Sequence, residues 1–126
     1  MKKILKDKAF ILPPTNDIHN VINKCSMFVS SSNYEGISNS MIEAMAMGLP
    51  CVCTDCLGGG AREMIIDGEN GLLVTVNDVD AMFEAMCRMV SEVGLADKCS
   101  RNAMKVRVDL DIKKIADQWL SIIEGI

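Results

Sequence analysis

Short apolar runs alternate along the chain with longer stretches in which apolar residues recur every three or four positions. The short runs are nearly continuous, as strands are when both faces of a parallel sheet are covered. We therefore predict four strands: Ala9–Leu12, Met27–Ser30, Cys51–Thr54 and Leu72–Val74. Helices are predicted between them at Asn16–Lys24, Asn39–Met47 and Ala61–Ile66. This alternation indicates an α/β fold, a parallel sheet with flanking helices.

From about residue 78 the chain contains only helical patterns. Val79–Val93 has the apolar spacing of an amphipathic helix, and Leu95–Val106 and Ile112–Ile123 repeat it. Trp119 belongs to the apolar stripe of the last of these helices. We expect that stripe to pack in the core or at an interface rather than to bind a ligand.

Composition and charge exclude several classes of protein. Of the 126 residues, 49% are hydrophobic and 24% are charged, which is typical of a folded globular chain. The net charge of −4 lacks the clustered Lys and Arg that nucleic acids require, so we expect no nucleic-acid partner. No apolar stretch approaches the roughly 20 residues that cross a bilayer, and the first eight residues lack a signal-peptide pattern. We expect a cytoplasmic protein without a direct membrane span.

Six cysteines raise the question of disulfides or a metal. Four of them, Cys25, Cys51, Cys53 and Cys87, lie in apolar periodic stretches, so we predict reduced, buried thiols. Cys51-x-Cys53-x2-Cys56 suggests zinc, but the first two belong to a predicted strand and the only histidine is distant. We therefore expect no metal site.

The segment that indicates chemistry begins where the strand Met27–Ser30 ends. Its loop, Ser31–Gly36, runs into a helix that starts near Asn39 or Ser40. Ligands of open α/β sheets bind at this edge, and amides at a helix start suit a diphosphate. The candidate amides belong to Gly36, Ile37, Ser38, Asn39 and Ser40.

Two carboxylates flank this helix start. Glu43 lies one turn into the helix, where its carboxylate could accept hydrogen bonds from a ribose diol. Alternatively, Ser40–Glu43 is a capping box whose carboxylate folds back onto the backbone. Glu35 lies in the loop, nearer the position of a sugar, although spacing alone favours a solvated acid. Gly58-Gly59-Gly60 is a weaker candidate for a phosphate loop, because it lacks the usual spacing and lysine.

The stretch Tyr34–Gly36 followed by Met41–Pro50 resembles the Glu-x7-Glu region of the group 1 (family 4) retaining glycosyltransferases. The resemblance covers roughly residues 9 to 124. Within the family, the sequence is similar in character to bacterial enzymes that build capsular polysaccharide, exopolysaccharide or lipopolysaccharide from UDP-sugars. Further matching runs are Cys51–Cys56, Gly59-Gly60, Arg62-Glu63, Asp67–Val74 and Trp119.

This resemblance implies the GT-B fold and its Rossmann-like carboxyl-terminal, donor-binding domain. By the matching positions, Glu43 would hold the ribose hydroxyls, and Glu35, the candidate catalytic residue, would contact the transferred sugar. The amides around Gly36, Ile37 and Ser38 would meet the sugar or the diphosphate. The donor, expected to be UDP-linked, is a substrate, and no cofactor or metal is implied.

The same resemblance implies that residues 1–126 form a partial nucleotide-sugar-binding domain. The family's amino-terminal acceptor domain, the first two strands of the donor domain and a basic Arg and Lys pair have no counterpart here. We therefore expect no sugar transfer by this chain alone, with membrane association left open for the full-length enzyme. The alternatives are a non-catalytic dimerising α/β module or remnant and, less favoured, a nucleotide-dependent epimerase.

The strand Ala9–Leu12 would have lost its neighbours in such a partial sheet. Unpaired apolar strands invite pairing. Two hypotheses follow: the strand pairs with its equivalent in a second subunit, giving a homodimer, or it relocates beside Met27–Ser30.

Overall fold

A three-stranded parallel sheet forms the centre of the protein. The computed structural model describes residues 8–125, and its strands lie in the order β1 (Phe28–Ser30), β2 (Cys51–Asp55) and β3 (Leu72–Thr75). Val52 of β2 pairs with Val29 of β1 and Leu72 of β3. Residues 51–54 are buried, as expected of a strand covered on both faces. The predicted α/β class is confirmed.

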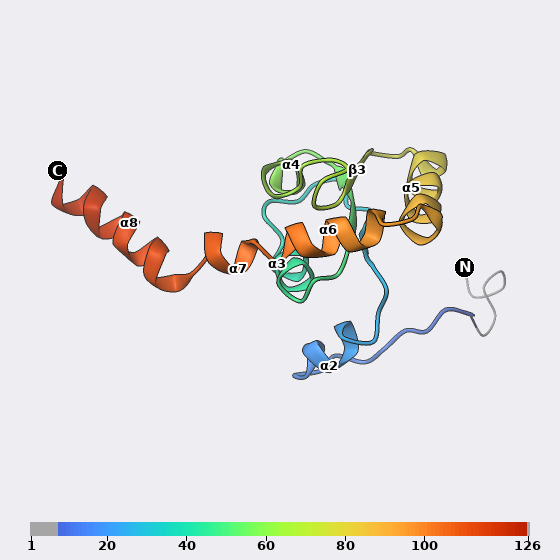
Figure 1. Cartoon of the computed structure of the whole chain (residues 1–126), viewed down its shortest axis with the longest axis horizontal. Helices are drawn as coiled ribbons and strands as arrows, with labels where there is room; N and C mark the ends of the chain where they lie inside the picture. The colour runs from blue at the N-terminus through green and yellow to red at the C-terminus, as the bar shows by residue number, and fades with distance from the viewer. Residues whose placement is uncertain (1–7, 126) are drawn as a thin grey trace.

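Two apolar clusters, one on each face of the sheet, form the core. Cys51 and Cys53 face α3 (Asn39–Ala46) and α4 (Gly60–Met64), whereas Val52 between them faces α5 (Val79–Ser91). Successive strand residues point to opposite faces, so β2 contributes to both clusters. The helix α6 (Leu95–Ala103) also joins them. In Figure 1, α5 and α3 accordingly lie on different sides of the sheet.

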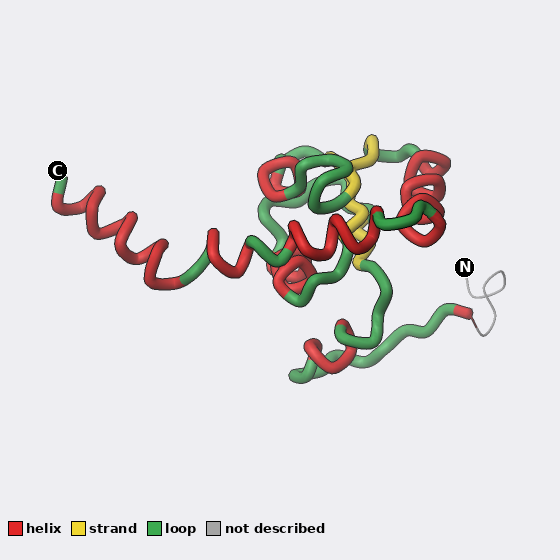
Figure 2. Tube along the Cα trace, viewed as in Figure 1, coloured by secondary structure: helices red, strands yellow, loops and turns green. Residues whose placement is uncertain are grey.

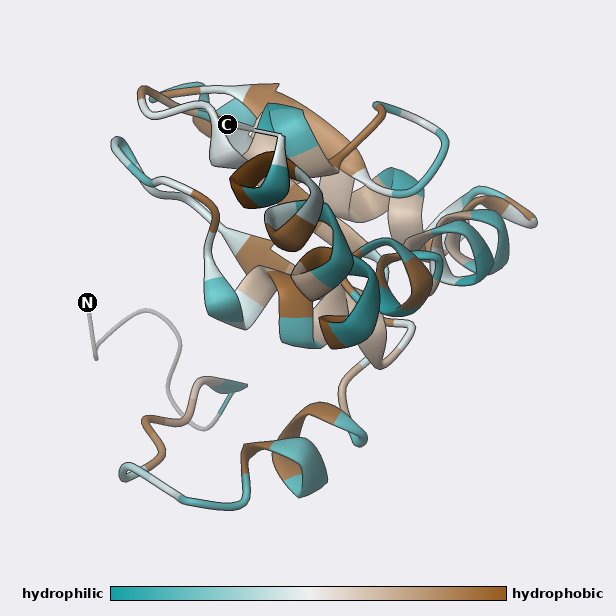
Figure 3. Cartoon of the chain, turned by 90° about the vertical axis from the view of Figure 1, so that its left-hand side faces the viewer, coloured by the Kyte–Doolittle hydropathy of each residue, from teal (hydrophilic) through white to brown (hydrophobic). Residues whose placement is uncertain are grey.

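The remaining helices are α2 (Ile18–Ile22), α7 (Val106–Asp109) and α8 (Ile112–Glu124). The predicted helix Leu95–Val106 is thus broken between α6 and α7, where the backbone turns at residues 104 and 105. Figure 1 shows α8 pointing away from the sheet, and none of its residues is buried. Figure 3 shows hydrophobic and hydrophilic residues along this helix. The Trp119 stripe therefore lies outside the core of this chain, and its packing at an interface stays a prediction.

The predicted strand Ala9–Leu12 is wrong. These residues form an irregular segment outside the sheet, with Phe10 and Ile11 exposed by 78% and 88%. Figure 2 shows the segment running to α2, apart from the strands. Relocation beside Met27–Ser30 is therefore also wrong. An apolar run becomes a strand only where a sheet edge supplies its hydrogen bonds, and Pro13-Pro14 and α2 carry this run away from β1.

The cysteines are all unpaired thiols, in two environments. Cys51, Cys53, Cys56 and Cys99 are buried, but Cys25 and Cys87 are exposed, contrary to expectation. Cys87 lies on the outer side of α5, whose buried residues are Ala85 and Met89. Within residues 8–125, no three potential ligands gather to hold a metal ion. Over the same residues, every helix is too short or too polar to cross a membrane.

Burial raises the pKa of the Cys53 thiol from 9.0 to about 11, and that of Cys51 further, with the neighbouring thiols adding to the Cys51 shift. The unfolded chain releases these protons at lower pH than the folded chain does. Their contribution to stability is therefore present below pH 9 and is lost as pH rises toward 11.

We predict that the free energy of unfolding falls by up to about 1.4 kcal/mol per pH unit for Cys53 in this alkaline window. Urea unfolding at several pH values measures the slope. The matched variant Cys53→Val removes one titrating group and should show a shallower slope. An equal slope in the two proteins would contradict the assignment.

Candidate nucleotide-sugar site

The loop between β1 and α3 is tied to the segment that follows β2. The Thr54 hydroxyl donates a hydrogen bond to the Ser32 carbonyl over 2.6 Å, and the Glu35 amide donates to the Leu57 carbonyl over 3.0 Å. Tyr34 and Leu57 form a parallel bridge. The loop is therefore held at the carboxyl edge of the sheet, the usual ligand-binding edge of such folds.

The glycine turn 58–60 supports the loop by direct backbone contact. A Cβ atom on Gly60 would lie 1.9 Å from the Gly36 carbonyl oxygen, and one on Gly58 would lie 2.3 Å from the backbone carbonyl oxygen of Glu35. Side chains are sterically excluded at both positions. By contrast, a Cβ on Gly36 would meet no atom within 4 Å, so this part of the loop faces open space.

The start of α3 presents unsatisfied backbone donors. Ser38 precedes the helix, but its hydroxyl pairs with the Ser40 hydroxyl at 2.8 Å and caps no backbone amide. The first backbone bond of this turn joins the Ile42 amide to the Ser38 carbonyl over 3.1 Å. The amides of residues 39–41 consequently have no acceptor within the described chain. Such donors, with the positive end of the helix dipole, suit an anionic ligand.

The alternative interpretation of Ser40–Glu43 as a capping box is wrong. The helix begins after Ser38 rather than Ser40, and no hydrogen bond joins the Glu43 carboxylate to the Ser40 amide. Glu43 is half-buried on α3, next to the buried residue Ala44. Its carboxylate makes no hydrogen bond to another residue between 8 and 125.

Glu35 is exposed, but a hydrogen bond orients its carboxylate. Its Oε2 atom accepts a hydrogen bond from the Ser32 hydroxyl over 3.1 Å, and that hydroxyl lies 3.3 Å from the Ser30 hydroxyl. A cavity of about 10 Å³ opens between Glu35, Gly36 and Ser38, large enough for about one water molecule. No Lys or Arg lines this cavity, so the donors in its vicinity are uncharged: side-chain hydroxyls and backbone amides.

The structure brings together part of the predicted set. Glu35, Gly36 and Ser38 line the small cavity, and Asn39 and Ser40 follow on the first exposed turn of α3. Ile37 is exposed, and Glu43 lies one turn further along without lining the cavity.

Sequence reasoning missed the supports of the loop: Thr54, Gly58 and Gly60. One signal was available for Thr54, a hydroxyl at the end of an otherwise apolar buried strand, where an unpartnered polar group would be costly. The two glycines were visible as a turn, but their contact with the loop depends on tertiary structure.

A parallel sheet with an uncapped helix start at its carboxyl edge defines an α/β domain suited to phosphorylated ligands. Residues 1–92 match the family described as Glycosyl transferases group 1. The chain belongs to this family.

Curated relatives from bacteria match almost the whole chain. The N-acetylgalactosamine-N,N'-diacetylbacillosaminyl-diphospho-undecaprenol 4-alpha-N-acetylgalactosaminyltransferase of Campylobacter jejuni is 36% identical, over 96% of this chain and 33% of the relative. The UDP-Gal:alpha-D-GlcNAc-diphosphoundecaprenol alpha-1,3-galactosyltransferase of Escherichia coli is 26% identical, over 94% and 31%. The chain thus spans about a third of the length of these relatives.

Solved structures confirm that the chain has the architecture of the corresponding part of GT-B glycosyltransferases. HepE of Anabaena, in complex with UDP and glucose, superimposes with a TM-score of 0.87 at 22% identity, over 97% of this chain and 33% of that protein. A variant of S. aureus TarM, in complex with fondaparinux, alpha-GlcNAc-glycerol and UDP, gives 0.85 at 27% identity, over 95% and 24%. The Rossmann-like sheet with flanking helices is therefore that of a GT-B glycosyltransferase.

We predict opposite outcomes for alanine at two glycines of the site. Gly60→Ala should lower the free energy of unfolding by about 1–3 kcal/mol, because its methyl group overlaps the Gly36 carbonyl. Gly36→Ala has open space and should change stability by less than about 0.5 kcal/mol. Urea unfolding of both variants provides the comparison. Equal free energies of unfolding for the two variants would show that the glycine turn does not closely contact the loop.

Proposed function

We propose that this chain is the donor-binding portion of a retaining glycosyltransferase that transfers a UDP-linked hexose or N-acetylhexosamine to a growing bacterial surface glycan. Family membership supports the transferase class. The names of the two bacterial relatives, both with diphospho-undecaprenol acceptors, support the glycan substrate. They also support a cytoplasmic protein that associates with the membrane in its full-length form. The UDP in complexes of HepE and TarM supports the choice of nucleotide.

The observation that carries this proposal is the uncapped start of α3 beside an open glycine. The amides of residues 39–41 would receive the diphosphate, with Gly36, Ile37 and Ser38 leading the ligand toward them. Glu43 would accept hydrogen bonds from the ribose hydroxyls. Glu35 would accept them from the hydroxyls of the transferred sugar, with its carboxylate held by Ser32.

In this arrangement the chain would stabilise the departing diphosphate and position the transferred sugar. The bond between the sugar and the diphosphate breaks, and negative charge accumulates on the departing diphosphate. Backbone amides fixed by Thr54 and the glycine turn would stabilise that charge without having to reorganise. Glu35 would hold the sugar in position while a hydroxyl of the acceptor, bound mainly by the amino-terminal domain, forms the new bond to the sugar and its proton passes to the departing diphosphate.

The second candidate function is a dimerising module without a nucleotide site. The exposed apolar residues of α8 and of residues 10–12 favour this reading, because such surfaces usually mark an interface. The two candidates differ in whether UDP binds.

We predict that UDP binds the 126-residue chain and that Glu43→Ala weakens its affinity about tenfold or more, since hydrogen bonds to a charged acceptor are lost. Isothermal titration calorimetry measures both proteins. Glu84→Ala, which removes an exposed carboxylate from α5, is the matched control and should bind UDP as wild type does. Glu35→Gln should retain UDP affinity and lose the additional affinity of a UDP-sugar.

Wild-type affinity in Glu43→Ala would remove the ribose role from that residue. Absence of UDP binding by the unsubstituted chain, together with a dimer by light scattering, would favour the dimerising module instead.

A further inference from the structure

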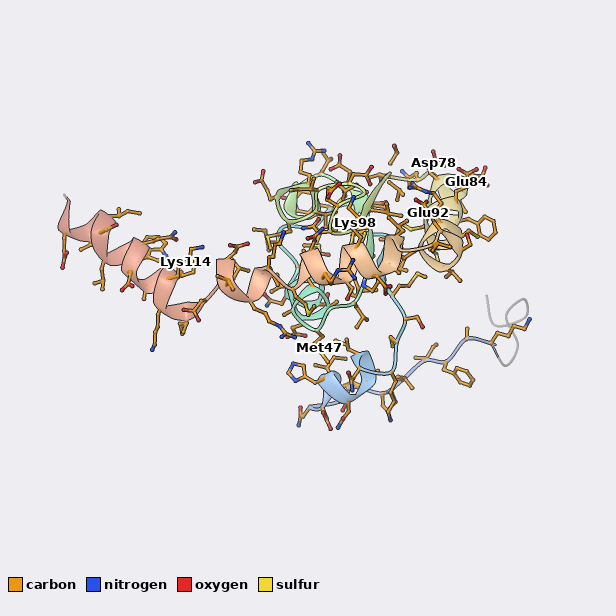
Figure 4. The ribbon with its side chains drawn as sticks, viewed as in Figure 1. Met47, Asp78, Glu84, Glu92, Lys98 and Lys114 are labelled. Carbon is orange, nitrogen blue, oxygen red and sulfur yellow. The ribbon has the colours of Figure 1, made fainter. Side chains whose placement is uncertain are left out.

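A second cavity lies on the same edge of the sheet, at the ends of all three strands. Its volume is about 290 Å³. Its polar lining comes from six residues: Ser31 and Asn33 of the β1–α3 loop, Thr54 of β2, Thr75 of β3, and Asn77 and Asp78 before α5. Figure 4 shows Asp78 where the chain reaches α5.

The β1–α3 loop separates this cavity from the small one beside Glu35. Ser32 and Glu35 line the small cavity, whereas Ser31 and Asn33 line the larger one. Thr54 lines both. The larger cavity is therefore adjacent to the proposed donor site, across a single segment of backbone.

The chemistry of the lining favours an uncharged polyol. Its polar side chains are hydroxyls, amides and one carboxylate, with no Lys, Arg or His to compensate a phosphate. The side chains of Ser31, Asn33, Thr75 and Asn77 make no hydrogen bond to other described residues. Asp78 is held in place, since its Oδ1 accepts from the Ala81 amide over 2.9 Å. Val79 and Met82 add apolar surface for the C–H groups of a sugar ring.

Asn77 occupies a restrained position at this cavity. With φ at +64°, it is the one residue other than glycine in residues 8–125 to adopt a positive φ. Asparagine tolerates this conformation better than most side chains, and such outliers cluster at ligand sites. The backbone thereby fixes the direction in which the Asn77 side chain leaves the chain, at the wall of the cavity.

We propose that this cavity binds one uncharged sugar unit of the acceptor glycan. This inference rests on the proposed transferase function, in which a glycan acceptor reaches the donor. Because the β1–α3 loop stands between the cavity and Glu35, the bound unit is a neighbour of the sugar that carries the attacking hydroxyl. The volume lies at the lower limit of small-molecule sites, roughly 300 Å³, and so suits a single ring rather than a nucleotide. The donor sugar itself is assigned to the other side of the loop, where Glu35 lies.

The test is an NMR titration of the isotope-labelled 126-residue chain, saturated with UDP, with the methyl glycosides of glucose, galactose, N-acetylglucosamine and N-acetylgalactosamine. At least one glycoside should shift the amide resonances of residues 75–79 and 31–33. Thr75→Val removes a hydroxyl at nearly constant shape and should weaken binding about fivefold, whereas Thr75→Ser should retain it. Asn77→Gly keeps a residue that accepts positive φ, removes the amide, and should weaken binding similarly.

UDP binding in the same samples distinguishes this inference from the proposed function. If UDP binds but no glycoside shifts the cavity resonances, or Thr75→Val and Asn77→Gly bind as wild type does, the inference is overturned and the donor function stands. If the glycosides displace UDP, or shift the resonances around Glu35 in place of those of the cavity, they occupy the donor site and the acceptor role is overturned. If UDP fails to bind, the proposed function fails, and the acceptor role fails with it.

Discussion

The contact between two backbone segments, the glycine turn 58–60 and the loop at Glu35 and Gly36, is the constraint on which the site depends. The turn follows β2, and the loop follows β1, so neighbouring parallel strands deliver both segments to one edge. Because Gly58 and Gly60 have no Cβ atom, the two backbone segments approach closely enough to hold the loop in a single conformation. Thr54 adds a hydrogen bond from the end of β2. The direction of α3, and hence of its exposed amides, follows from where this loop ends.

The proposed anion site does not depend on the net charge of the protein. The chain carries −4 overall, and no basic residue lines the small cavity. Backbone dipoles at the start of α3 act over the first turn, whereas scattered surface charges are screened over about 10 Å at moderate ionic strength. A local, fixed field therefore decides which ligand is favoured, and an acidic chain can present an attractive surface to a diphosphate.

How far the sequence predicts the structure depends on whether the determining contact is local. The β2 strand was predictable because its apolar run is continuous. In the structure it is the buried central strand, paired with β1 on one edge and β3 on the other. Ala9–Leu12 shows equal local apolarity, but no adjacent edge pairs with it. In the candidate site, the segment Glu35 to Glu43 stands out through the family resemblance, because spacing alone favours a solvated acid at Glu35 and leaves a capping box open at Glu43. The bond from Thr54 to Ser32 joins residues 22 positions apart, and the fit of Gly60 against Gly36 depends on the packing of two turns, neither of which spacing reveals.

The alternation of lining residues along the β1–α3 loop has an evolutionary consequence. Ser31 and Asn33 serve one cavity, and Ser32 and Glu35 serve the other. Point substitutions can change either side separately, so the linings of the two cavities can diverge independently within one short segment. Insertion or deletion of a single residue would instead displace residues that line both cavities at once. Selection should therefore tolerate variation in the identity of these residues far more readily than variation in the length of the loop.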